Sequence, residues 1–234
     1  MKTLPFIIPG ALGLLLALSL TSCSTSGSSS PQTAASGQPA PEANSSSAGA
    51  PSVAGATPVS LANIFNIVGI VPDNSQFTDS LDGDGNDCSS NVIHDSCSWK
   101  GVPFQLGSAS KGANVVTCNG QTIPLPAGKF SKLEMLATGV NGAQASQNFV
   151  ITYSDPSLDQ TNTQSVSDWY QPDGNTGEAQ VIDMDYRDQS DGSRDDEPFY
   201  IYGYSFDLKS GGTATGLVLP SNNNLKVFAV TLVP

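Results

Sequence analysis

From Val59 to the C-terminus, the chain is a series of short apolar runs separated by Gly, Asn, Asp and Pro. Several runs alternate: Phe149, Ile151 and Tyr153 would share one face of a strand, and Ala179–Tyr186 has the same period of two. No stretch keeps the 3.6-residue apolar period of a helix. The pattern predicts an all-β domain over residues 59–234, built as a two-sheet β-sandwich or jelly roll.

Some strands and turns can be assigned more closely. Leu225–Val233 is apolar on both faces, which is typical of a central strand covered on both sides. Ser98–Leu106 is expected to form one strand, and the alternating aromatic residues of Tyr200–Phe206 are expected to belong to the core. Asn119-Gly120 and Asn141-Gly142 each separate two strand-like runs, which predicts two hairpins whose turns need positive φ.

The N-terminus carries the features of an export signal. Lys2 precedes an almost wholly apolar run from Leu4 to Leu20, and small residues follow. A transmembrane anchor is the alternative, although it needs about 20 apolar residues. Leu20-Thr21-Ser22-Cys23 resembles the lipobox of bacterial lipoproteins. That resemblance implies a signal peptide over residues 1–22, acylation of Cys23, and a bacterial cell-envelope protein held on a membrane by its lipid; Ser24 implies the outer membrane.

Residues 23–58 lack the composition of a folded segment. From Ser24 to Thr57 the chain is mainly Ser, Ala, Gly, Pro, Thr and Gln, with Glu42 as its only charge and no aromatic residue. Such a segment cannot bury enough apolar surface to offset its chain entropy. We therefore expect a disordered tether that spans about 30 Å on average.

The charge balance and the single histidine exclude several function classes. The chain has 9 Lys+Arg and 21 Asp+Glu, for a formal net charge of −12, which argues against nucleic-acid binding. His94 is the only histidine, and the sequence contains no paired-histidine zinc motif, no nucleophile elbow and no glycine-rich phosphate loop. We therefore expect a protein that is not an enzyme, with a glycoside hydrolase as the least favoured alternative.

Three cysteines remain once Cys23 is acylated. An exported chain is in a compartment where disulfides form. A Cys88–Cys97 bridge would close a short loop around His94, whereas Cys97–Cys118 would join two strands. The short loop favours Cys88–Cys97, and the third thiol is expected to be buried and unreactive.

Two acidic segments are candidate calcium sites. Asp82, Asp84, Asn86 and Asp87 offer oxygen ligands at close spacing between glycines, as a loop around Ca²⁺ does. The second segment holds five acids in ten residues, Asp188, Asp191, Asp195, Asp196 and Glu197, and Asp191, Asp195 and Asp196 are its candidate ligands. The alternative is that both segments are solvated turns.

Aromatic side chains near predicted turns are the candidate ligand-binding residues. Trp169 and Tyr170 follow Asp168 and precede an exposed turn, and Trp99 stands near another turn. A flat ring can stack on the C–H face of a sugar while the neighbouring carboxylate accepts its hydroxyl groups. Trp169 could instead fill the core.

Several segments in order carry a family resemblance: Ser80–Gly85, Trp99–Phe104, Gly120–Gly128, Ser167–Trp169 and Tyr202–Phe206. They resemble the jelly-roll, galactose-binding-like carbohydrate-binding modules appended to secreted bacterial glycoside hydrolases. The resemblance implies a module that binds glycan. Together with the lipobox and the two acidic segments, it leads us to expect a non-catalytic, membrane-tethered glycan-binding module, with structural Ca²⁺ as an option. The alternative is an envelope structural or protein-interaction module without a sugar site. The sequence carries no signal for an oligomeric state.

Overall fold

The structure, a computed structural model, describes residues 52–234. The expected signal peptide (1–22), the acylation site Cys23 and most of the expected tether lie outside these residues. Within them, every regular element is a strand except one 3₁₀ turn, η1 (Pro156–Leu158), so the all-β prediction is confirmed. No helix in this part of the chain could span a membrane.

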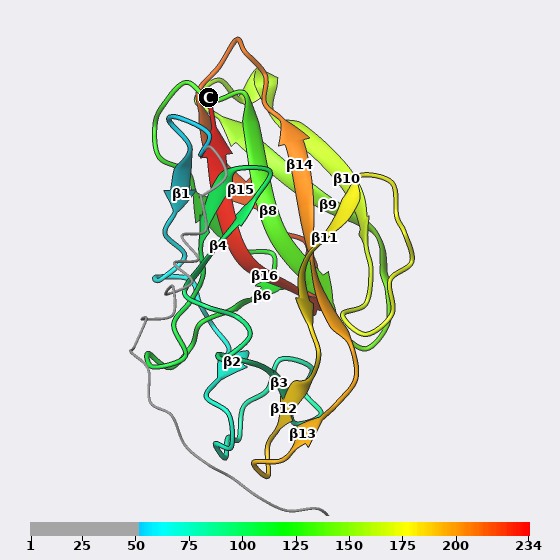
Figure 1. The fold of residues 1–234 in the computed structure, drawn as a ribbon. Coiled ribbons are helices and arrows are strands. Elements are labelled where there is room, and N and C mark those ends of the chain that lie inside the picture. Colours follow the sequence, from blue (N-terminus) through cyan, green and yellow to red (C-terminus); the bar gives the residue numbers. More distant parts are fainter. Residues whose placement is uncertain (1–51) are drawn as a thin grey trace, which may run out of the picture. The chain divides into compact units, whose positions relative to one another are not determined.

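The larger sheet has six strands and forms the centre of the domain (Figure 1). Strand β16 lies between β1 and β8, and β14 and β11 follow β8, while β6 pairs with the start of β16. All of these pairings are antiparallel. The strands are β1 (Thr57–Val59), β6 (Val116–Asn119), β8 (Lys132–Gly139), β11 (Glu178–Met184), β14 (Phe199–Asp207) and β16 (Ser221–Val233).

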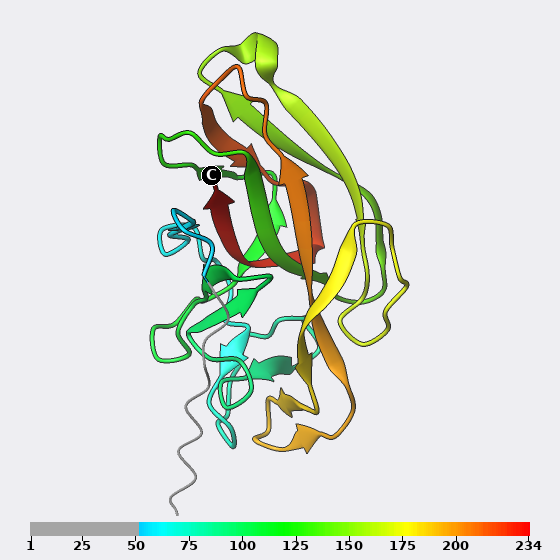
Figure 2. The same ribbon diagram turned by 45° about the horizontal axis from the view of Figure 1, so that its top comes forward.

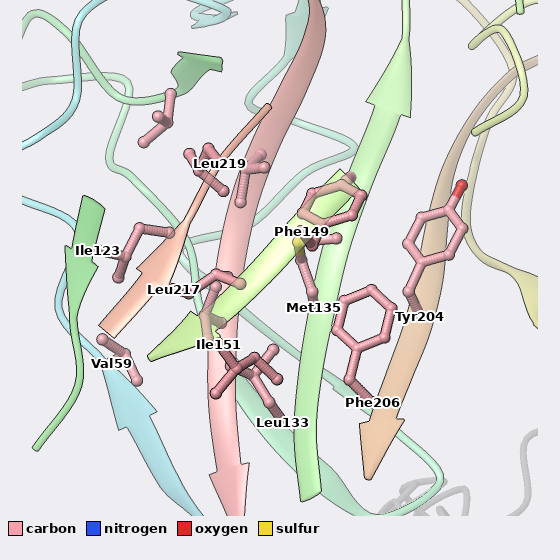
Figure 3. Close-up of a cluster of buried hydrophobic side chains, with 14 of the residues drawn as sticks. Val59, Ile123, Leu133, Met135, Phe149, Ile151, Tyr204, Phe206, Leu217 and Leu219 are labelled. Carbon is pink, nitrogen blue, oxygen red and sulfur yellow. The ribbon is translucent and has the colours of Figure 1, made fainter. Parts of the chain in front are cut away.

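A four-stranded antiparallel sheet packs on one face of the larger sheet. Its order is β10-β9-β15-β7, and the strands are β7 (Thr122–Pro124), β9 (Gln144–Tyr153), β10 (Gln160–Val166) and β15 (Ala214–Val218). Phe149 and Ile151 of β9 meet Met135 of β8 and Tyr204 of β14 in the core between the two sheets (Figure 3). The predicted two-sheet sandwich is therefore confirmed.

A further layer covers the opposite face of the larger sheet. It contains the hairpin of β4 (Ser96–Trp99) and β5 (Val102–Gln105). It also contains a small sheet of order β13-β12-β3-β2, in which only β2 and β3 are parallel. Figures 1 and 2 show β2 and β3 beside β12 and β13 at one end of the molecule. The strands of this small sheet are β2 (Ile70–Val71), β3 (Asn86–Ser89), β12 (Arg187–Gln189) and β13 (Arg194–Asp195).

Both faces of strand β16 are apolar because a hydrophobic core lies on each side of it. Leu225 to Val233 are all buried. Val227 and Val230 belong to the core between the two sheets, whereas Phe228 and Ala229 belong to the core under the further layer. The predictions for this strand and for the buried Tyr202 and Tyr204 of β14 are confirmed.

The two predicted hairpins are wrong. β6 and β7, on either side of Asn119-Gly120, belong to different sheets, and so do β8 and β9 on either side of Asn141-Gly142. Asn141 and Gly142 do adopt positive φ, 58° and 103°. Left-handed turn residues reverse the chain, but whether the next strand pairs with the last one or crosses to the facing sheet depends on distant partners.

One predicted strand is a hairpin. Lys100 and Gly101 have φ of 52° and 77° and reverse the chain inside Ser98–Leu106, so that Trp99 pairs with Val102. The sequence did not indicate this turn, because lysine rarely adopts the positive φ that Lys100 has here.

The expected Cys88–Cys97 disulfide is not formed: Cys88, Cys97 and Cys118 are all free. Cys88 on β3 pairs with Ile70, and Cys97 on β4 pairs with Phe104, so different sheets hold the two residues despite their proximity in sequence. Burial raises the pKa of the Cys97 thiol to about 11 and raises that of Cys88 and Cys118 further. These thiols are therefore protonated and unreactive near neutral pH.

Candidate functional site

The segment Ser167–Tyr170 connects the ends of two central strands. The Trp169 N–H donates to the Gly139 carbonyl (2.8 Å) at the end of β8, and the Trp169 carbonyl accepts from the Tyr200 N–H (2.7 Å) in β14. The Asp168 carboxylate accepts from the N–H groups of Tyr170 (2.8 Å) and Gly142 (2.7 Å). Asp168 therefore ties the 141–142 turn to this segment and holds Tyr170 in place.

Trp169 and Tyr170 point into different environments. Trp169 is 2% exposed, and its ring centroid lies 4.8 Å from that of Phe199. Tyr170 is 50% exposed and is the one large apolar side chain of residues 52–234 with high exposure. Trp169 is thus a core residue, and the prediction that it stacks on a ligand is corrected: a ring this buried has no free face. Tyr170, which has an exposed ring, remains a candidate for that role.

Arg187 is the central side chain beside these rings. Its guanidinium carbon lies 4.6 Å from the Phe199 ring centroid and 5.3 Å from that of Trp169. Its Nη2 lies 3.0 Å from Asp195 Oδ2, and its Nη1 lies 3.5 Å from Asp82 Oδ2. Arg187 was not among the predicted site residues. Its position as a basic residue next to Asp188 was the available signal, because burial of a carboxylate favours a nearby counter-charge.

These residues surround a surface cleft of about 500 Å³. The cleft combines an exposed aromatic ring, a guanidinium, carboxylates and a side-chain amide. Its lining residues are Asn141, Gly142, Asp168, Tyr170, Arg187, Asp195 and Glu197. Tyr170 and Asp168 come from the predicted ligand site and Asp195 from the second acidic segment, so the tertiary structure joins two sites that the sequence kept apart.

Trp99 lies outside the cleft. Its ring packs against the backbone of β14, where a Cβ on Gly203 would come within 2.8 Å of ring carbons. Lys100 Nζ lies 4.4 Å from the ring centroid. Trp99 is half-buried and holds the β4–β5 hairpin on the larger sheet, which corrects its assignment to the ligand site.

A larger hollow of about 580 Å³ lacks these groups. It is lined mainly by small and aliphatic residues, with Lys129 as its one charged side chain. Its aromatic ring, Phe130, is half-buried, and its polar side chains are hydroxyl groups and one lysine, with no carboxylate, guanidinium or amide side chain. We therefore take the cleft beside Tyr170 as the candidate site.

In the first acidic segment, both carboxylate oxygens of Asp82 accept hydrogen bonds from its own loop. Asp82 Oδ1 accepts from the N–H groups of Asp84 (2.8 Å) and Asn86 (3.2 Å), and Oδ2 accepts from the Asn86 side-chain amide (2.7 Å). The spacing that predicted calcium ligands thus also builds a hydrogen-bonded loop. Across residues 52–234, no group of three or more His, Cys, Asp or Glu side chains is arranged to hold a metal ion.

The candidate ligands of the second acidic segment each have a different partner. Asp195 pairs with Arg187, Asp196 pairs with Arg194 at 2.7 Å, and Asp191 accepts from the N–H (2.9 Å) and hydroxyl (2.6 Å) of Ser193. The two acidic segments meet through β3 and β12, where Asp87 lies opposite Asp188.

Asp87 and Asp188 are buried, and the Oδ2 atom of each has no hydrogen-bond partner within the described residues. Burial raises the pKa of Asp87 to about 8, and the nearby carboxylate of Asp82 adds to this. Burial and the charge of Asp73 raise the pKa of Asp188 to about 6. Asp188 belongs to the second acidic segment, but nothing in its local sequence indicates that it faces another carboxylate.

Comparison with known proteins identifies the domain at the level of the family. No curated protein matches the chain. The family described as AziU2-like beta-sandwich domain matches residues 55–234, which include every strand from β1 to β16. The chain therefore belongs to the AziU2-like beta-sandwich domain family.

Proposed function

We propose that the domain binds glycan without catalysing a reaction, and that the cleft beside Tyr170 is its binding site. The observation that carries the proposal is the half-exposed Tyr170 ring beside the paired Arg187 and Asp195. A sugar offers an apolar C–H face together with a rim of hydroxyl groups, and this cleft presents a partner for each.

The polar side chains retain hydrogen-bonding capacity. Arg187 has five N–H donors, and its two ion pairs engage only part of them. Each Asp168 oxygen accepts one backbone N–H and can accept a further hydrogen bond. Glu197, exposed at the cleft, adds a carboxylate. The cleft can therefore hydrogen-bond the hydroxyl groups of a sugar from two sides while the sugar ring stacks on Tyr170.

The proposal includes attachment to a membrane through acylated Cys23, with the outer membrane as the favoured location. Many tethered copies would bind a polymeric glycan together, so a weak single-site affinity would suffice. A structural Ca²⁺ ion also belongs to the proposal. Its support is Asp87 Oδ2, a buried carboxylate oxygen without a hydrogen-bond partner in residues 52–234.

The test is binding of the full chain to an array of neutral polysaccharides and oligosaccharides, with and without Ca²⁺. We expect millimolar to high-micromolar binding. Tyr170→Ala should weaken it by about fivefold, since aromatic packing contributes about 0.5–1.5 kcal/mol. Tyr170→Phe keeps the ring and should bind as the wild type does.

Two results would contradict the proposal. Absence of binding to every glycan would reject the function and favour a protein-interaction or structural module. Binding that is unchanged in Tyr170→Ala would keep the function but reject the site. The melting temperature of each variant shows whether its fold is intact.

A further inference from the structure

Lys226 is a buried charged residue in the centre of the larger sheet. It lies on β16, pairs with Thr117 of β6, and is 4% exposed. Its neighbours along the strand, Leu225 and Val227, are fully buried core residues. A lysine is almost never this buried unless its ammonium group is paired.

The ammonium group of Lys226 has few partners inside the protein. Nζ donates to Thr117 Oγ1 at 2.9 Å, while an ammonium group can donate three hydrogen bonds. None of the salt bridges found within residues 52–234 involves Lys226. Burial lowers the pKa of the Lys226 ammonium, and the more distant carboxylates of Asp82 and Asp79 offset this only in part.

Lys226 lies at a polar hollow of about 390 Å³. The volume falls in the range of about 300–1,000 Å³ that is typical of small-molecule sites. The walls supply hydroxyl, amide and carboxylate groups from Thr78, Asp79, Ser80, Asp82, Asn223 and Asn224. This hollow shares only Asp82 with the ion pairs of the Tyr170 cleft.

The two carboxylates of the hollow differ in their availability. Both oxygens of Asp82 are engaged by its own loop and by Arg187. Asp79 is exposed, and its Oδ2 accepts one hydrogen bond, from the Val68 N–H at 3.2 Å. The hollow therefore combines a buried ammonium with unused donors and an exposed carboxylate with unused acceptors.

We infer that this hollow is a second binding site, for a small zwitterion of the amino-acid type. The carboxylate of the ligand would pair with Lys226, and its ammonium group would pair with Asp79. A simple anion gains the first contact but is repelled by Asp79 and Asp82, and a simple cation is repelled by Lys226. Only a ligand that carries both charges satisfies both ends.

The experiment measures binding of glycine to the full chain by calorimetry and compares it with acetate and methylammonium, which each carry one of the two charges. L-Serine and L-asparagine extend the series to polar side chains. We expect saturable binding of the amino acids that is at least fivefold tighter than that of either single-charge probe. Lys226→Met should abolish it.

Asp79→Asn is the matched variant, because Asp79 is exposed and its substitution leaves the core unchanged. It should weaken glycine binding and strengthen acetate binding, since the repulsive charge is removed while the lysine remains. This variant also tests the inference if Lys226→Met does not fold. Tyr170→Ala should leave glycine binding unchanged, which separates this site from the glycan cleft.

The inference is overturned if none of the amino acids binds saturably. It is also overturned if acetate binds as tightly as glycine, or if Asp79→Asn alters neither affinity. Each of these results is independent of whether the chain binds glycan.

Discussion

Among single residues, Asp87 and Asp188 have the least favourable surroundings for a charge. They lie opposite each other on β3 and β12, respectively, both are buried, and each has an oxygen without a partner in the described part of the chain. Like charges that face each other across two strands are destabilising. Burial makes the charged form of each carboxyl costly, and this is the main reason why both pKa values are raised; the carboxylates of Asp82, for Asp87, and of Asp73, for Asp188, add to it.

We predict that the domain loses stability as the pH rises from 5 to 8. The folded state keeps the Asp87 proton up to about pH 8, whereas a free aspartate releases it near 3.8. The folded state therefore binds more protons in this interval, and stability falls as the pH rises. At about 1.4 kcal/mol per pH unit, this group alone would lower the free energy of unfolding by up to about 4 kcal/mol over the interval, and each kcal/mol lowers the melting temperature by about 2–4 °C.

Asp87→Asn should flatten this pH dependence, because its amide does not titrate and can still accept from the Leu81 N–H. Asp84→Asn, at an exposed position of the same loop, is the control and should keep the wild-type profile. A profile that is already flat in the wild type would show that Asp87 is ionised in the fold.

A second prediction separates the adjacent rings of Trp169 and Tyr170. Trp169→Ala should cost about 3–5 kcal/mol of unfolding free energy, since it removes a fully packed ring from the core. Tyr170→Ala should change it by about 0.5 kcal/mol or less, as is usual for exposed positions. Chemical denaturation measures both, and equal losses would contradict the assignment of Tyr170 as a surface residue.

At the scale of elements, the β4–β5 hairpin depends on one glycine of β14. Trp99 and Val181 approach Gly203 so closely that a Cβ there would lie 2.8 Å and 2.7 Å from their side-chain carbons. Only glycine fits at this position unless Trp99 or Val181 moves.

We therefore predict that Gly203→Ala destabilises the domain by about 1–3 kcal/mol, the usual cost of overpacking. The fluorescence of Trp99 should change, because its ring must shift. Gly211→Ala is the matched control, since a Cβ at Gly211 would contact nothing within 4 Å. Equal stability of the two variants would show that the hairpin moves freely.

The pairing of β3 with β12 brings together Asp87 and Asp188, the two carboxyl groups that would bind Ca²⁺. Saturating Ca²⁺ at pH 8 should raise the melting temperature by several degrees, since a ligand at one hundred times its Kd adds about 2.7 kcal/mol. The shift should vanish at pH 5, where Asp87 and Asp188 hold protons instead. A melting temperature that EGTA does not alter at pH 8 would leave both acidic segments as hydrogen-bonded turns.

At the scale of the whole molecule, the expected anchor at Cys23 determines where the β-sandwich works. Cys23→Ser should remove the acylation site and move the protein from the membrane fraction to the soluble fraction. Several acyl chains, at about 0.8 kcal/mol per buried CH₂, would account for the firm attachment that we expect of the wild type. Membrane fractionation is the measurement, and a variant that stays in the membrane fraction would support the transmembrane alternative.

Features that depend on local alternation were predictable from the sequence. The strand class, the buried face of Phe149, Ile151 and Tyr153, and the doubly covered β16 all follow from side chains that alternate along an extended backbone. The positive φ of Asn141 and Gly142 also followed from residue type. Each of these properties depends on a residue and its immediate neighbours.

Only the tertiary structure decided which distant segments meet. Nothing near Asp87 or Arg187 in the sequence indicates that β3 pairs with β12, or that Arg187 lies between Asp82 and Asp195. The same applies to Trp169 and Tyr170: both rings lie against Phe199, but Trp169 is buried while Tyr170 is half exposed and lines a cleft. Pairing and burial depend on contacts between residues far apart in the chain, and local sequence patterns do not record those contacts.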